Sequence, residues 1–115
     1  MGIIKGVIEN KNRLHKKIIK DALREANTIA DVLLKRFGAS EVILFGSLAE
    51  EEYFDEASDI DIAVKGLKDN YFRAYGYCLG LGKYNLDIKP YEDLSKKLKK
   101  NIDKRGKLLY GRRDS

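Results

Sequence analysis

The chain has 115 residues and a formal net charge of +5, with one cysteine and one histidine; 43% of its residues are hydrophobic and 36% are charged. Such a chain fits one domain with one modest core, and it excludes an internal disulfide and a Cys/His metal cluster, so any metal must be held by oxygen atoms. Because no apolar stretch approaches the roughly 18 residues of a membrane span and the N-terminus lacks a signal-peptide pattern, we expect a cytoplasmic protein without membrane contact.

The first expected element is an amphipathic helix from about Asn10 to Phe37, either continuous or broken in two. Its apolar residues recur at three- and four-residue steps with charged residues between them: Leu14, Ile18, Ala22, Ala26, Ile29, Leu33 and Phe37. Gly38 is well placed to end this helix. We favour the interpretation that the stripe covers the protein's own sheet, with docking to a partner as the alternative.

The remaining elements are shorter. A buried strand is expected over Glu41–Phe45, a second and alternating strand over Ser58–Val64, and a third over residues 84–91 that Pro90 ends. Weak helical character marks residues 69–81, and a basic helix is expected over residues 92–105. The predicted order is therefore helix, strand, strand, helix, strand, helix, in one α/β (α+β) unit.

Two carboxylates share one face of the second predicted strand. Asp59 and Asp61 point to one side because side chains alternate along a strand, while the isoleucines beside them point to the other. Like charges so close raise each other's pKa, a cost that a divalent cation removes, and Mg²⁺ prefers carboxylate, water and phosphate oxygens. Asp87 has the equivalent position in the third strand, so a neighbouring strand would bring it beside the pair. Three carboxylates suit two metal ions.

Gly46 and Ser47 follow the first strand and supply what a phosphate needs. A tight turn here, opening a short helix at Ser47, presents free backbone N–H groups and a hydroxyl to an anion. Glycine tolerates the positive φ that such a turn requires. A structural alternative is that Ser47 caps the helix, with Glu50 three residues later forming a capping box. The two roles are compatible.

Taken together, these motifs resemble the polymerase-beta-like nucleotidyltransferases, and at this length their minimal nucleotidyltransferase (MNT) group. The resemblance rests on an apolar strand, Gly46-Ser47, eleven residues, Asp59-Ile60-Asp61 with an apolar tail, and an isolated Asp87 on a strand. It covers about residues 23–110, including the closing "GKLLYG". It implies a small mixed β-sheet with helices packed against it, and a Mg²⁺-dependent transfer of a nucleoside monophosphate from ATP or another NTP to a hydroxyl acceptor, the EC 2.7.7 type of reaction.

The resemblance also implies roles for individual residues. Gly46 and Ser47 would hold the β- and γ-phosphates. Asp59 and Asp61 would bind the metals, and Asp87 would bind the catalytic metal and help to activate the acceptor. Small members of the group are often paired with a helical HEPN protein, for which the MNT chain is the antitoxin, in some cases by adenylylating a tyrosine.

We expect a HEPN-type partner or a second copy of the chain to complete the pocket, because the chain lacks the helical domain of larger relatives. Residues 1–22 are expected to be a basic helical extension and residues 23–115 the nucleotidyltransferase domain. The first turns hold the apolar residues that are better candidates for an interface: Ile3, Ile4, Val7 and Ile8.

Two other hypotheses remain open. After Gly46-Ser47 the family commonly continues with an Arg-Ala-Arg-Gly type segment, whereas this chain has Leu-Ala followed by Glu50, Glu51 and Glu52. The second hypothesis is therefore a catalytically silent module that keeps a nucleotide and a HEPN-type partner. The third is a basic nucleic-acid-binding domain, since residues 1–38 and 96–115 carry net charges of +5 and +7 around an acidic middle of −7. It is less favoured because the basic tracts do not interleave aromatic residues.

Overall fold

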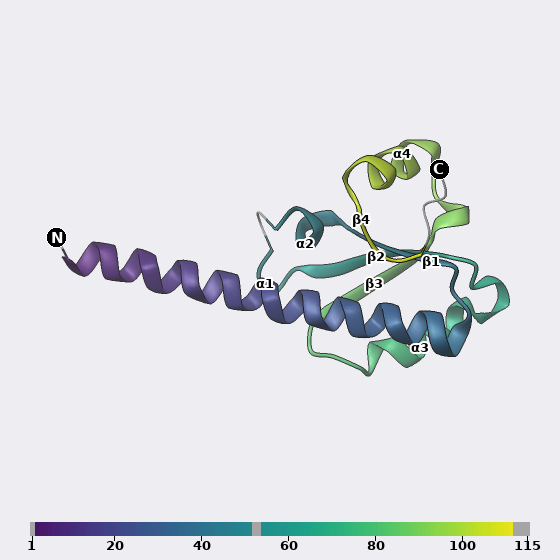
Figure 1. Cartoon of the computed structure of the whole chain (residues 1–115), viewed down its shortest axis with the longest axis horizontal. Coiled ribbons are helices and arrows are strands. Elements are labelled where there is room, and N and C mark those ends of the chain that lie inside the picture. The colour runs from purple at the N-terminus through teal and green to yellow at the C-terminus, as the bar shows by residue number, and fades with distance from the viewer. Residues whose placement is uncertain (1, 52–53, 112–115) are drawn as a thin grey trace.

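The computed structural model describes residues 2–51 and 54–111, and in the first helix it describes side chains from residue 13 onward. In the described part of the chain, the fold consists of four helices and four strands, with two short 3₁₀ turns, η1 and η2, between them (Figure 1). Their bounds are α1 Gly2–Phe37, β1 Glu41–Phe45, α2 Gly46–Glu50, β2 Asp59–Lys65, η1 Lys68–Asn70, α3 Tyr71–Leu79, β3 Asn85–Pro90, η2 Tyr91–Asp93, α4 Lys96–Arg105 and β4 Lys107–Tyr110.

The strands form one mixed sheet in the order β3-β2-β1-β4. β1 is antiparallel to both β2 and β4, whereas β2 and β3 run parallel. Parallel neighbours need a crossover connection, and η1 with α3 provides it between β2 and β3. The α+β fold with a small mixed sheet that the sequence predicted is confirmed.

Helices cover the two faces of the sheet unequally. α1 and α3 lie on one face, and α4 lies on the other (Figure 1). The larger hydrophobic cluster joins α1 and α3 to alternate residues of β1, β2 and β3. The smaller cluster, under α4, contains Ile43, Phe45, Ala63 and Ile102. Alternation along each strand therefore assigns its residues either to a thick apolar layer or to a thinner one.

α1 is longer than expected: it begins at Gly2, has 36 residues and is not broken. At 1.5 Å per residue it is about 54 Å long, and its N-terminal half projects beyond the sheet (Figure 1). The predicted stripe is buried where it crosses the sheet, with Ala22 and Leu33 fully buried, whereas Leu14 is 56% exposed. The helix runs through residues 22 and 23 without interruption, so the domain boundary predicted there stays a prediction. Ile3, Ile4, Val7 and Ile8 lie outside the described side chains.

Other boundaries differ from the predictions for local reasons. The predicted 92–105 helix is divided into η2 and α4, because the backbone is extended at Leu94 and Ser95. Ser95 caps α4 by accepting a hydrogen bond from the Leu98 N–H at 3.2 Å. The predicted 69–81 helix is likewise divided into η1 and α3. β4 was not among the predicted strands, and it forms by pairing with β1.

β3 is fixed in place by contacts from both α1 and α3. Tyr71 and Tyr75 of α3 donate hydrogen bonds to main-chain carbonyl oxygens of this edge strand, the second at 2.8 Å. Glu25 of α1 accepts the N–H groups of Lys83 and Tyr84, just before β3, at 2.8 and 3.2 Å. These contacts set where the residues of β3 lie relative to β2.

Among the described helices, none combines the length and hydropathy that crossing a bilayer requires.

Candidate active site

Asp59 and Asp61 lie on the α4 side of β2, as the strand alternation predicted. Their neighbours Ile60 and Ile62 are fully buried in the larger cluster on the opposite face. Asp59 is exposed at the start of the strand, and Asp61 is partly buried one pleat further in. One strand therefore carries the hydrophobic core on one side and two carboxylates on the other.

The sheet brings Asp87 next to Asp61. β2 and β3 are parallel, and in their register Asp61 stands opposite Asp87 while Asp59 stands opposite Asn85. Residues opposite each other in adjacent strands project to the same face at the interstrand spacing of about 4.8 Å. The three predicted carboxylates thus share one face, with Asp61 between the other two.

Gly46 lies directly against Asp61, because β1 and β2 are antiparallel with Phe45 opposite Asp61. Its φ is +73°, a left-handed conformation that side chains rarely adopt, and a Cβ at this position would stand 2.3 Å from Asp61 Oδ2. Glycine is therefore required twice, once for the turn and once to leave space for the carboxylate. The two halves of the sequence motif meet at this contact.

Ser47 is the second residue of α2 rather than its cap. α2 begins at Gly46, its N-cap is Phe45 in extended conformation, and no side chain makes a cap hydrogen bond. The structural alternative, in which Ser47 caps the helix and forms a capping box with Glu50, is therefore wrong, because the helix begins one residue earlier than expected. Ser47 remains at the first turn of the helix, adjacent to the Gly46–Asp61 contact.

The carboxylates interact strongly. Burial, and then the negative charges of Asp87 and Asp59, raise the pKa of Asp61 from 3.8 to about 6, with Lys89 acting in the opposite direction. The protein thus holds Asp61 where its negative charge is unfavourable without a compensating cation. The sequence predicted that Asp59 would raise the pKa of Asp61, and it does so, but burial and Asp87 contribute more.

Lys89 is a member of the site that the sequence interpretation missed. Its Nζ is 2.6 Å from Asp87 Oδ2, and the two side chains are 37% and 33% exposed. The hydrogen bond with Asp87 raises the pKa of Lys89. The available signal was the two-residue spacing, which places Lys89 on the same face of β3 as Asp87.

The three aspartates fit a hard divalent cation, because their carboxylate oxygens are the ligands that such a cation prefers and they lie beside Gly46, which has no side chain to block the site. Within residues 2–51 and 54–111, however, no group of three or more His, Cys, Asp or Glu side chains is arranged so that it could already hold a metal ion. Asp87 is directed to Lys89 instead. A metal shared by the aspartates would bind beside the positive charge of Lys89, which disfavours it.

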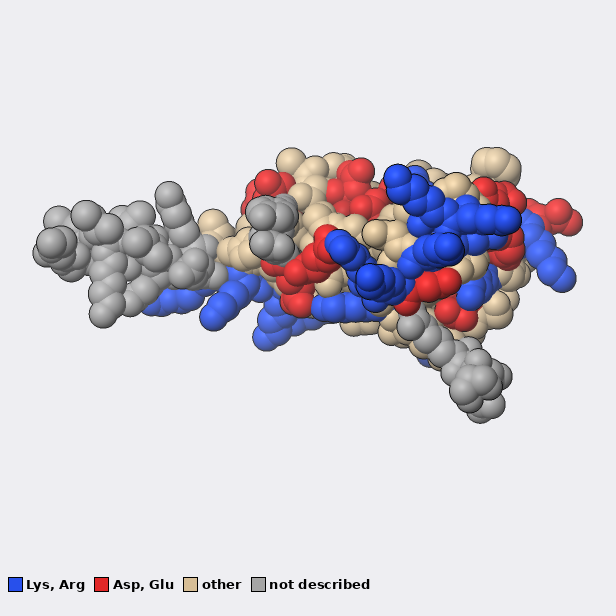
Figure 2. All heavy atoms as spheres, turned by 90° about the horizontal axis from the view of Figure 1, so that it is seen from above, with Lys and Arg blue, Asp and Glu red and all other residues tan. Residues whose placement is uncertain are grey.

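The acidic residues after Gly46-Ser47 have basic partners. Glu50 Oε1 is 3.5 Å from Arg105 Nη1, and Glu51 Oε2 is 2.8 Å from Lys107 Nζ. Seen from the α4 side, basic side chains gather over α4, and acidic side chains lie both toward the end from which α1 projects and at the opposite end (Figure 2). Glu52 and Tyr53 lie outside the described residues.

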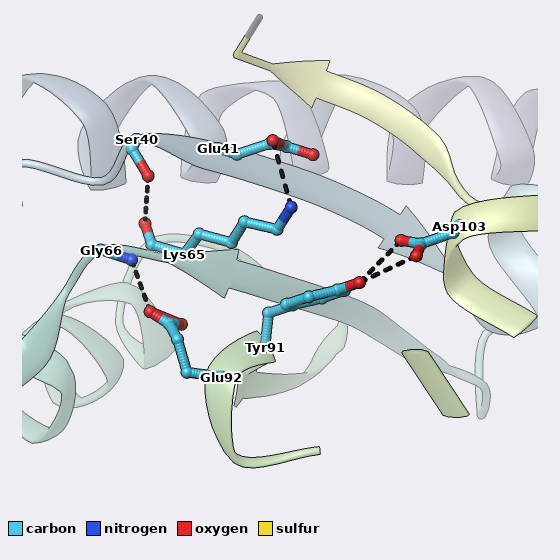
Figure 3. A network of polar contacts seen from close by, with 7 residues as sticks. All are labelled: Ser40, Glu41, Lys65, Gly66, Tyr91, Glu92 and Asp103. Atoms are coloured by element: carbon cyan, nitrogen blue, oxygen red, sulfur yellow. Dashed lines mark hydrogen bonds and ion pairs between the residues drawn. The ribbon is translucent and has the colours of Figure 1, made fainter. Parts of the chain in front are cut away.

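A second polar cluster on the α4 face joins β1, β2, η2 and α4, and Figure 3 shows its members: Ser40, Glu41, Lys65, Gly66, Tyr91, Glu92 and Asp103. The Tyr91 hydroxyl donates to both carboxylate oxygens of Asp103 at 2.9 Å, and its ring lies 4.3 Å from Lys65 Nζ. Glu92 accepts the Gly66 N–H at 3.0 Å. Because these groups satisfy one another, we interpret this cluster as structural: it attaches η2 and α4 to the sheet.

Comparison with known proteins identifies relatives in family and in fold. A family model described as polymerase beta nucleotidyltransferase matches residues 27–115. A protein assigned as a minimal nucleotidyltransferase has a TM-score of 0.62 at 26% identity, over 76% of this chain and 92% of that one. A toxin–antitoxin structure with AMP-PNP and a MntA-HpeT toxin–antitoxin structure both have TM-scores of 0.63, at 22% and 20% identity, over 76% of this chain and 74% of theirs, which shows likeness of fold alone. No curated protein matches the chain.

Proposed function

Since this chain belongs to the polymerase beta nucleotidyltransferase family and has the fold of its minimal members, we propose that it transfers AMP from ATP to a hydroxyl acceptor. The observation that carries the proposal is the meeting of Gly46, Asp61 and Asp87. Gly46, the first residue of α2, lies against the Asp61 carboxylate, and Asp61 stands opposite Asp87 in the adjacent strand. This combination of anion donors and cation ligands suits a triphosphate bound with a divalent cation.

Each residue then has a chemical role. Gly46 and Ser47 bind the β- and γ-phosphates through the first turn of α2, and Asp59, Asp61 and Asp87 are the ligands that would hold Mg²⁺. When bound, Mg²⁺ neutralises charge that develops on the transferring phosphate and orients the attacking and leaving oxygens in line. Asp87 also helps to activate the acceptor, because its carboxylate accepts the proton of the acceptor hydroxyl.

The reaction exchanges one phosphorus–oxygen bond for another. The acceptor oxygen attacks the α-phosphorus of ATP, the bond from that phosphorus to the β-phosphate oxygen breaks, and pyrophosphate leaves. The acceptor proton passes through Asp87 to solvent. The protein supplies position and electrostatic stabilisation.

We further propose that the acceptor belongs to a protein partner, in a toxin–antitoxin pair in which this chain is the antitoxin and a HEPN-type protein the toxin. Two observations support this. The similar structures include toxin–antitoxin complexes, one of them with AMP-PNP. The site is also open to solvent, with Asp59 exposed and the Asp87 side chain one-third exposed, which leaves room for a partner to complete the pocket.

The test is transfer of label from α-³²P-ATP to a co-purified partner, with and without Mg²⁺. We expect wild-type protein to label the partner, and the double variant Asp59→Asn with Asp61→Asn to lose both labelling and Mg²⁺-dependent ATP binding measured by calorimetry. The matched control is Asp69→Asn, which removes a carboxylate from η1, outside the three-aspartate face. Unchanged ATP binding in the double variant would refute the proposal.

The second candidate, a catalytically silent module with the same partner, is favoured by a specific observation: acids stand where the family pattern has basic residues after Gly46-Ser47. It predicts ATP and partner binding without label transfer to any protein or RNA. Labelling of the partner therefore excludes it. Binding of both ligands with no labelling across several nucleotides would replace the first proposal by this one.

A further inference from the structure

Lys89 is held at the edge of the acidic face by the strand geometry. It follows Asp87 by two residues on β3, and its register partner on β2 is Ala63, which is buried under the smaller cluster. Lys89 Nζ contacts Asp87 Oδ2 at 2.6 Å. A cation therefore already occupies one oxygen of the carboxylate that stands opposite Asp61.

This contact opposes the binding of a metal to the same oxygen. A Mg²⁺ ligand oxygen stands about 2.1 Å from the ion, so an ammonium at hydrogen-bond distance from that oxygen would be within a few ångströms of a divalent charge. Like charges at that separation repel strongly at a site partly shielded from water. Mg²⁺ on Asp87 Oδ2 therefore weakens the contact with Lys89, and Lys89 in turn weakens Mg²⁺ binding at that oxygen.

A displaced Lys89 has an obvious alternative partner when a nucleotide is bound. Its ammonium is a compact charge on a flexible four-carbon stem with three rotatable donors, and charge-assisted hydrogen bonds to phosphate are among the strong ones in proteins. Gly46 and Asp61 are in contact, so a triphosphate held at the start of α2 would border the face on which Lys89 lies.

We propose that Lys89 is the cation with which Mg²⁺ competes for Asp87, and that after displacement it binds a phosphate oxygen of the nucleotide. Mg²⁺ and nucleotide then favour each other's binding. Mg²⁺ releases Lys89 from Asp87, and the nucleotide offers the released ammonium a phosphate oxygen. By thermodynamic linkage the effect is the same in both directions. Lys89 is a positioning residue here, and the inference rests on the proposed function for the nucleotide.

The first test is calorimetric titration with Mg²⁺ without nucleotide, on the full-length protein. We expect Lys89→Met to bind Mg²⁺ about two- to fivefold more tightly than wild type, the range that loss of one partly exposed ion pair implies. Lys89→Arg, which keeps the charge, should bind as wild type does. The matched control Lys97→Met removes one positive charge from the exposed surface of α4 and should also leave the affinity unchanged.

The second test measures the coupling between the two ligands. In wild type, a non-hydrolysable ATP analogue should tighten Mg²⁺ binding, and Lys89→Met should reduce this gain by about tenfold, the value of one charge-assisted hydrogen bond. Circular dichroism and thermal unfolding establish that the variant is folded. Equal coupling in wild type and Lys89→Met, or equal or weaker Mg²⁺ binding by Lys89→Met alone, would overturn the inference.

These readouts separate the inference from the proposed function. If wild-type protein binds Mg²⁺ and ATP and labels its partner while Lys89→Met behaves identically, only the role of Lys89 fails. If wild-type protein binds neither ligand, the proposed function fails, and the role of Lys89 with it.

Discussion

The two faces of the sheet differ in what covers them and in what they carry. On the α1 and α3 side, the inward residues of β1, β2 and β3 are apolar, and all of them except the half-buried Pro90 are buried in the larger cluster. On the α4 side, the smaller cluster covers only part of the sheet, and the uncovered part carries Asp59, Asp61, Asp87 and Lys89. Stability is concentrated on one face, and the candidate chemistry on the other.

β2 shows why this separation is useful. Ile62 is fully buried and Asp61 is partly buried, although they are consecutive in the chain. Burial of apolar surface on one face can offset the unfavourable charge cluster on the other, because the two contributions act on different sides of the same strand. The comparison predicts that substitutions on the two faces have opposite consequences for stability and activity.

Asp61→Asn should have the largest effect, and it should lower activity without lowering stability. We expect nucleotidyl transfer to fall by about 100- to 1,000-fold, the cost of removing a group that acts electrostatically on the transition state. In Mg²⁺-free buffer the free energy of unfolding should stay equal or rise, because the substitution removes a charge that burial and Asp87 make unfavourable. Labelling assays and chemical denaturation measure the two quantities. A large loss of stability would contradict the division between the faces.

Ile62→Ala should give the opposite result. Ile62 is fully buried in the larger cluster, so its truncation should lower the free energy of unfolding by about 3 kcal/mol. Activity per folded molecule, measured well below the melting temperature, should be close to wild type. Ile62→Val, which leaves a smaller cavity, should cost about 1 kcal/mol and serves as the graded control.

Gly46→Ala should lower both stability and activity, because Gly46 forms the turn after β1 and also contacts Asp61. Its control is Gly38→Ala: φ is +78° at Gly38 and +73° at Gly46, but a Cβ at Gly38 would meet nothing within 4 Å. Both substitutions should cost about 1 to 2 kcal/mol from the left-handed backbone. Only Gly46→Ala should also displace Asp61 and reduce transfer by about tenfold or more. Equal activity in the two variants would mean that the contact with Asp61 has no functional role.

The charge cluster should also appear in the pH dependence of stability. The folded-state pKa of Asp61, about 6, lies above its usual 3.8, so the folded protein binds this proton more tightly than the unfolded chain does. Stability from this group is complete below about pH 4 and is lost as the pH rises through 6. The shift corresponds to at most about 3 kcal/mol, which solvent screening reduces to about 1 kcal/mol.

The measurement compares wild type with Asp61→Asn by chemical denaturation in buffer with chelator, between about pH 4 and pH 7.5. The variant should be the more stable protein at the upper end, and the difference should disappear at the lower end. A difference that does not change with pH would show that Asp61 is not held in an unfavourable charge state.

Much of this division between the faces could be predicted from local sequence pattern. β1 has the bounds predicted for it, and the alternation in β2 placed Asp59 and Asp61 on one side correctly, because burial patterns with a period of two are properties of a single strand. The parallel pairing of β2 with β3 could not be predicted in this way. It depends on how α3 and Glu25 position β3, and the sequences of the two strands do not indicate it.

The missed features are likewise those that depend on neighbours. β4 has only four residues, with its two middle residues half-buried and its ends exposed, so it lacks the alternation that identifies a strand. Lys89 was overlooked because a lysine two residues after an aspartate indicates a functional site only when the face that the two side chains share is known to be acidic. The Gly46–Asp61 contact requires the β1–β2 register.

The smallest expected effect concerns Glu51, and it tests whether the acidic segment weakens the site. Glu51 pairs with Lys107 at 2.8 Å, but the side chains are 45% and 47% exposed, so Glu51→Gln should change the free energy of unfolding by less than about 0.5 kcal/mol. Because Lys107 balances the charge of Glu51, ATP affinity should change by less than about threefold, and Lys107→Met should remove this balance and weaken ATP binding. A tenfold gain in ATP affinity in Glu51→Gln would instead show that the acid opposes the triphosphate, and would favour the silent module.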